Sequence, residues 1–173
     1  MAEIDLRYRL SGLSRGEASS PKVQPLAAVI AGLLAGLVLL LMLEFLAVVI
    51  YDEPPWKLFR AIAAMVFGPD TLEPDDEYQL GAMALGLGLH FSFSVLYALA
   101  FCRLLVEFPS EVAPWLGMLF GVVLYSVNFY GFTNLFPWLS AMRSFDTLVS
   151  HALFGLILAL MYWSFHAPGK PSR

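Results

Sequence analysis

The chain is poor in cysteine and in charge. Its 173 residues include one cysteine, Cys102, and only 14% charged residues. A single cysteine excludes an intramolecular disulfide and every metal or iron–sulfur motif that needs several cysteines. A soluble domain is about a quarter charged, because it must keep a wet surface. The low charge therefore argues against a soluble domain, and the absence of any basic run argues against nucleic acid as a partner.

Common catalytic motifs are also missing from the sequence. It contains no glycine-rich phosphate loop, no HExxH and no GxSxG, which would indicate nucleotide, zinc-protease and hydrolase chemistry respectively. No nucleophile–base pair suited to lipid chemistry is evident. The sequence therefore does not favour an enzyme.

Long apolar runs are what the chain does have, with hydrophobic residues making up 59% of it. A membrane-spanning helix needs about 20 apolar residues, and lipid offers no partners for open backbone groups, so helix is expected in each run. The first run is too long for the apolar core of a signal peptide and is interpreted as a retained helix. The predicted spans are 26–51, 80–105, 115–136 and 148–165.

Lysine and arginine are distributed unequally between the two sides that these spans create. Seven lie in the N-terminal arm (1–25), the second loop and the tail (166–173), and three lie in the first and third loops. Positive residues stay on the cytoplasmic side. We therefore expect both termini to be cytoplasmic, and the small size and simple plan of the chain favour a bacterial inner membrane.

The two halves of the chain share an ordered set of landmarks: a pair of glycines four residues apart, a Pro-Trp, an arginine and a histidine. These are Gly32/Gly36, Pro55–Trp56, Arg60 and His90 in the first half, and Gly117/Gly121, Pro137–Trp138, Arg143 and His151 in the second. They predict an all-α, integral membrane four-helix bundle built from two tandem helical hairpins, 26–105 and 115–165, related by a pseudo-two-fold axis along the membrane normal. The alternative is that apolar sequences with few residue types align by chance.

A further short helix is predicted after the first span. Residues 56–67 place apolar side chains at helical spacing, with Lys57 and Arg60 near one edge. The segment is too short to span a bilayer, so we expect an interfacial helix on the outer face.

One strongly polar residue falls in each predicted span: Glu44, His90, Asn128 and His151. Counting about 1.5 Å per residue places all four in the outer half of the bilayer. Polar groups inside spans usually face the protein interior, so these four are expected to form a buried polar layer. In the structural interpretation of this layer, Glu44 is bonded to Asn128 or Tyr125 and the histidines are neutral and satisfied locally.

Two histidines on diagonal helices could instead ligate one b-type haem axially. His90 and His151 are then the candidate ligands, and Arg60 and Arg143 are candidates to contact the propionates or lipid headgroups. Gly86 and Gly155, one turn from the histidines, would leave room for the porphyrin edge. In general plan alone, this arrangement resembles the four-helix b-type cytochromes.

Two other functions are compatible with the sequence. Glu44 with the two histidines could serve as a proton relay or an ion site in a small translocating protein. The interpretation favoured by small size and faces rich in small residues is an accessory or assembly subunit of a larger membrane complex. Its expected partners are the lipid bilayer and other membrane protein subunits or further copies of the chain.

Overall fold

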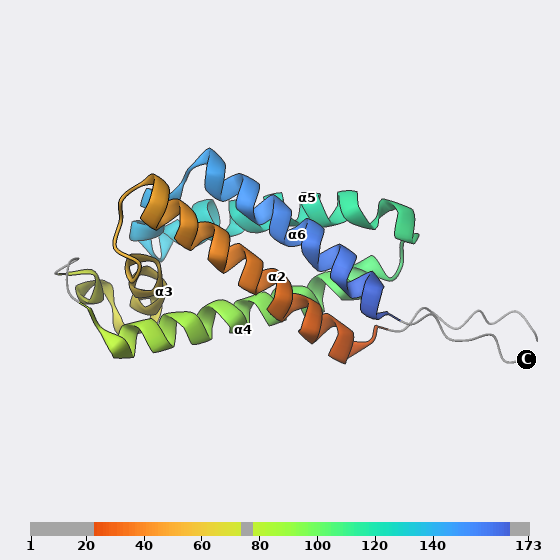
Figure 1. The fold of residues 1–173 in the computed structure, drawn as a ribbon, viewed down its shortest axis with the longest axis horizontal. Helices are drawn as coiled ribbons and strands as arrows, with labels where there is room; N and C mark the ends of the chain where they lie inside the picture. Colours follow the sequence, from red (N-terminus) through yellow and green to blue (C-terminus); the bar gives the residue numbers. More distant parts are fainter. Residues whose placement is uncertain (1–22, 74–77, 167–173) are drawn as a thin grey trace, which may run out of the picture.

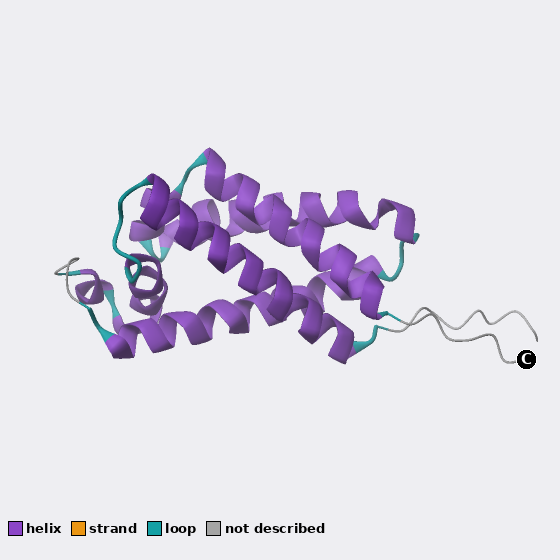
Figure 2. Cartoon of the chain, viewed as in Figure 1, coloured by secondary structure: helices purple, strands orange, loops and turns teal. Residues whose placement is uncertain are grey.

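The computed structural model describes residues 23–73 and 78–166 of the chain. Most of the predicted arm and tail, residues 1–22 and 167–173, therefore lies outside the described residues. Within the described part every regular element is helical and no strand occurs (Figure 2). The long helices are α2 (Pro25–Phe45), α4 (Leu80–Leu105), α5 (Ala113–Ser126) and α6 (Phe145–Phe165), and the short helix α3 (Lys57–Phe67) follows α2.

Four helical stretches are long and apolar enough to cross a membrane, which confirms the predicted all-α class and number of spans. Two of them are longer than their α-helices, because α2 and α5 each continue into one π-helical turn, at Leu46–Ile50 and Val127–Gly131. The third stretch also includes the 3-10 turns Ser110–Val112 and Phe132–Asn134 on either side of α5 and its π-helical turn. The candidate spans are therefore Pro25–Ile50, Leu80–Leu105, Ser110–Asn134 and Phe145–Phe165.

Local sequence explains where several helices begin and end. Pro25 stands at the first helical position of α2, where its missing N–H is not needed. Ser144 caps α6 by accepting a hydrogen bond from the Thr147 N–H at 3.0 Å. Gly68 ends α3 with a φ of 93°, a backbone conformation that glycine adopts without a side-chain clash.

The four long helices alternate in direction, and the described ends of the chain meet at one end of the bundle (Figure 1). There the backbone N–H of Gln24 donates to the Tyr162 hydroxyl at 3.3 Å. Helix α2 packs against both α4 and α6, α5 packs against α6, and α4 contacts α5 at few points. The helices predicted to be diagonal, α4 and α6, also contact each other little.

Within each hairpin, the glycine pairs lie at equivalent positions. A Cβ on Gly32 would lie against Ala98 of α4, and one on Gly117 would lie against Ala159 of α6. Both alanines are eight residues after the histidine of their own helix. Packing between the hairpins is unequal, however, because α2 lies along α6 whereas α4 and α5 scarcely meet. The predicted pseudo-two-fold relation is therefore not confirmed.

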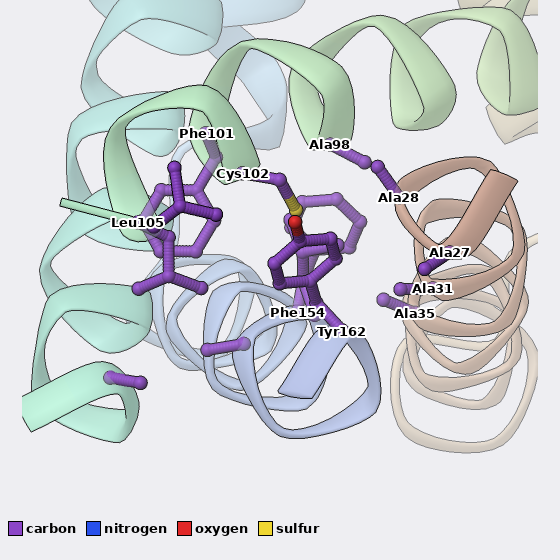
Figure 3. Packing of buried hydrophobic residues seen from close by; sticks show 14 of the residues in the cluster. Ala27, Ala28, Ala31, Ala35, Ala98, Phe101, Cys102, Leu105, Phe154 and Tyr162 are labelled. Carbon is purple, nitrogen blue, oxygen red and sulfur yellow. The ribbon is translucent and has the colours of Figure 1, made fainter. Parts of the chain in front are cut away.

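The larger of two apolar clusters begins at the end of the bundle where the described termini meet and extends along α2 to Leu39. A smaller cluster of Tyr125, Phe129 and Leu139 lies toward the other end. Small residues of α2 approach α4 and α6 closely, and Ala28, Ala31 and Ala98 have no exposed surface. Figure 3 shows Ala28 opposite Ala98, with Tyr162 directed toward Cys102. Because side chains this small occupy the interface, the helix backbones come close enough for extensive van der Waals contact.

Helix α3 crosses the long helices at the other end of the bundle, where Figure 1 shows it almost end-on. It packs chiefly against α4. It does not bury the whole apolar face expected from sequence, since Val66 and Phe67 are about three-fifths exposed (61% and 60%). Its buried residues instead include Arg60, which the sequence placed at an edge.

Candidate functional site

The predicted polar layer surrounds a small cavity beneath α3. The cavity has a volume of about 110 Å³ and is mostly apolar. His90, Asn128 and His151 line it, together with Ser94 and Tyr97 of α4. The structure therefore brings together three of the four residues of the predicted layer.

Glu44 is the member of the layer that does not reach this cavity. It lies one position beyond Leu43, which does line the cavity, and therefore points about 100° further around α2. Its Oε1 atom is buried and has no hydrogen-bond partner among the described residues. No hydrogen bond from Glu44 to Asn128 or Tyr125 occurs among the described residues, and Glu44 does not line the cavity with the histidines.

Each histidine is bonded to a backbone carbonyl, but the two bonds differ. His90 Nε2 lies 2.9 Å from the Gly36 carbonyl oxygen, so it links α4 to α2. His151 Nδ1 lies 2.8 Å from the Thr147 carbonyl oxygen of its own helix. A carbonyl oxygen only accepts, so each of these nitrogens carries the proton. Each histidine is thus hydrogen-bonded to a nearby backbone group, as the structural interpretation of the polar layer expected.

Asn128 pairs with Tyr97 of α4, which the sequence analysis did not include in the polar layer. The Tyr97 hydroxyl donates to Asn128 Oδ1 at 3.0 Å. This bond joins α4 to the π-helical turn that ends α5, across the side of the bundle where the two helices otherwise meet little. Only the position of Tyr97 in the sequence could have indicated this role, because it lies seven residues after His90 and therefore on the same face of the helix.

A porphyrin does not fit between His90 and His151 in this arrangement. Small-molecule sites usually measure about 300–1,000 Å³, well above the 110 Å³ found here. The space expected beside the glycines is also filled, since a Cβ on Gly86 would meet the backbone of Phe59 and one on Gly155 would meet the Gly117 carbonyl. His90 Nε2 is already bonded to Gly36. These glycines admit neighbouring helices, and we derive no haem chemistry from the site.

The two candidate arginines hold backbone carbonyls. Arg60 is 2% exposed, and its Nε donates to the Thr71 carbonyl at 2.8 Å. Arg143 donates from Nε to the Phe129 carbonyl at 2.6 Å. It also lies over the Tyr130 ring, with Cζ 4.3 Å from the ring centroid. Both side chains therefore stabilise the loop end of the bundle, although Arg143 remains exposed.

Two further bonds, which sequence reasoning missed, connect the halves of the chain at this end. The Trp138 Nε1–H donates to the Ala61 carbonyl at 2.9 Å. The Tyr51 hydroxyl donates to Asp146 Oδ2 at 2.5 Å. This bond to a carboxylate favours the neutral phenol and raises the pKa of Tyr51 above its ordinary value of about 10. The stabilisation is therefore present below that value and is lost as the pH rises through the raised pKa.

A second cavity, larger than the first, lies next to it. It is lined by the end of the first span, by α3 and by the start of α6. Its volume is about 650 Å³. Four residues line both cavities: Leu43, Leu58, Phe129 and Met142. The larger cavity is thus separated from the histidines by apolar side chains.

Comparison with known proteins assigns no family to this arrangement. No protein-family model, no curated protein and no solved structure matches the chain. The described residues contain no group of three or more histidine, cysteine or acidic side chains placed to hold a metal ion.

Proposed function

We propose that this chain is a non-enzymatic subunit of a membrane complex, and that α4 is the helix that packs against its partner. The observation that carries the proposal is the outward face of α4. Small residues make up much of its exposed side, namely Gly81, Ala84, Gly88, Ser92 and Ala100, and between the membrane-spanning ends Leu87 and Leu96 are the large residues exposed among them.

These residues differ from those on a helix face that contacts only lipid. The outward face of α2 carries large apolar side chains, among them Leu33, Leu37 and Leu41. By contrast, a Cβ on Gly81 or Gly88 would meet nothing within 4 Å. A glycine inside a helix costs about 1 kcal/mol relative to alanine. Small residues in lipid let a second helix approach closely. Contact with a partner helix would therefore explain why α4 has glycines on its exposed side despite their cost.

The polar residues support a structural role for the interior. The bonds of His90, His151 and Arg60 to backbone carbonyls, and of Tyr97 to Asn128, all lie within the chain. They use the polar groups to join helices and loops. The partner is another membrane protein subunit or a second copy of the chain.

Ser92→Leu should disrupt this association. The added side chain would separate closely packed helices, and overpacking typically costs about 1–3 kcal/mol, so we expect the affinity of the complex to fall by about 5-fold to 150-fold. Co-purification in mild detergent, with cross-linking in the native membrane, measures the loss.

Ser126→Leu is the matched control for that experiment. Both serines are exposed, and each donates from its hydroxyl to the carbonyl four residues earlier, Gly88 for Ser92 and Val122 for Ser126. The control should keep the complex. Equal retention by the two variants, or isolation of the unmodified chain as a monomer from native membranes, would contradict the proposal.

We further propose that the protein resides in a bacterial inner membrane with both termini in the cytoplasm, on the support of the unequal lysine and arginine distribution. Cysteines introduced at Asp70 and Glu107, which are exposed at opposite ends of the bundle, provide the test. In intact cells an impermeant maleimide should label Asp70→Cys, and Glu107→Cys should react only after permeabilisation. The native Cys102 is buried and serves as the unlabelled background. The reverse labelling pattern would overturn this orientation.

A further inference from the structure

The larger cavity has the size and the mixed lining of a binding site for an amphiphile. Its volume of about 650 Å³ lies within the range of about 300–1,000 Å³ typical of small-molecule sites. Leu43, Phe129 and Met142 form an apolar floor toward the first cavity. Charged groups line other parts of the wall, so one occupant would meet both kinds of surface.

The charged part of the wall carries both signs, with Lys57 and Arg60 as cations and Glu53 and Glu73 as carboxylates, and Arg60 already donates to the Thr71 carbonyl. Lys57 Nζ and Glu53 Oε2 lie 2.6 Å apart, and both residues line the cavity with side chains that are 46% and 37% exposed. Glu73 adds a second, exposed carboxylate. Exposed ion pairs contribute only about 0.2–1 kcal/mol, so this pair can open at little cost.

The cavity lies where the membrane-spanning helices end. Tyr51 follows the last turn of the first span and Ser144 caps the fourth, and both line it. Trp138 lines it as well. Tyrosine and tryptophan are enriched at the level of lipid headgroups. The polar wall is therefore at headgroup depth, and the apolar floor continues toward the hydrocarbon.

We propose that this cavity binds the headgroup and upper acyl region of a zwitterionic phospholipid. The phosphate replaces Glu53 beside Lys57, and the ammonium pairs with Glu53 and Glu73. Opening the Lys57–Glu53 pair would leave one charge unpaired if the ligand carried a single sign, whereas a zwitterion supplies a partner to each. The proposal is independent of the partner proposed for α4.

Trp138 provides a fluorescent reporter inside the cavity. Its three companions, Trp56, Trp115 and Trp163, are replaced by phenylalanine, and the protein is placed in nanodiscs of phosphatidylglycerol. A minor fraction of phosphatidylethanolamine, brominated near the glycerol end of its acyl chains, is then added as a quencher. We expect brominated phosphatidylethanolamine to quench Trp138 to the same extent as brominated phosphatidylglycerol at about one tenth of its mole fraction. This tenfold difference corresponds to a binding preference of about 1.4 kcal/mol.

Two substitutions test whether the cavity itself is responsible. Ala47 lines the cavity and lies on the same π-helical turn as Val49, which is exposed and does not line it. Ala47→Phe should abolish the preference between the two lipids, and Val49→Phe should keep it. Lys57→Gln, which removes the partner of the phosphate without filling space, should also reduce the preference.

Equal quenching by the two brominated lipids would overturn the proposal. So would a preference that survives both Ala47→Phe and Lys57→Gln in protein of unchanged helix content, because the reporter would then be sensing lipid outside the cavity. Because Lys57→Gln changes an exposed side chain, it gives a result even where the phenylalanine prevents folding.

Discussion

Gly121→Ala is expected to destabilise the protein by about 3 kcal/mol, the upper end of the usual cost of overpacking. A Cβ at this position would lie against the carbonyl group of His151 and the Cα of Ala152. Backbone atoms cannot move aside as a flexible side chain can, so α5 and α6 would have to separate. These two helices share the most extensive interface in the bundle. Separating them would therefore weaken packing contacts along the whole interface. The unfolding midpoint in a denaturing detergent, followed by circular dichroism, measures the loss.

Gly88→Ala is the matched control for this experiment, which is done on the single chain separated from the partner proposed for α4. Gly88 is also a helical glycine, but a Cβ there would meet nothing within 4 Å. Alanine favours a helix by about 1 kcal/mol over glycine, so the control should be neutral or stabilising. Similar losses of stability in both variants would show that α5 and α6 are not packed as described.

Arg60→Ala is expected to destabilise the fold by about 3 kcal/mol, and Arg143→Ala by no more than about 1 kcal/mol. A hydrogen bond from a charged group contributes about 1.5–3 kcal/mol, and a buried arginine stem adds packing that alanine loses. Arg60 is 2% exposed and donates to the Thr71 carbonyl. Arg143 also donates to a carbonyl but is exposed, so water can replace much of what the substitution removes.

The same detergent unfolding assay compares the two arginine variants. A loss of stability that is equal for both would contradict the difference in burial. A larger loss for Arg143→Ala would show that the segment before α6, rather than α3, depends more on its arginine.

The spans and their helical character were predictable because the bilayer imposes them. An apolar run of about 20 residues in lipid has no alternative to satisfying its own backbone, and that requirement is visible in residue order alone. The polar layer was partly predictable for the same reason. His90, Asn128 and His151 do line one cavity, as depth along each helix and the inward preference of polar groups indicated.

The partners of these residues were not predictable, because they depend on contacts between helices that are distant in sequence. Glu44 was assigned to the layer from its depth, but its angle around α2 directs it away from the cavity. Gly86 and Gly155 were interpreted as space for a cofactor, whereas the backbones of Phe59 and Gly117 occupy that space. A glycine in a sequence shows that something can approach closely, and the identity of the approaching group follows from packing.

Sequence by itself determined that this chain has four apolar helices of spanning length and a short helix after the first, because helix formation in each run depends on local composition. Only the tertiary structure decided which helices are neighbours and which of two similar arginines is buried. Arg60 and Arg143 follow equivalent Pro-Trp landmarks, but α3 carries Arg60 into the bundle while the segment before α6 leaves Arg143 exposed. The physical reason is that burial depends on the elements that pack around a residue, and those elements come from distant parts of the chain.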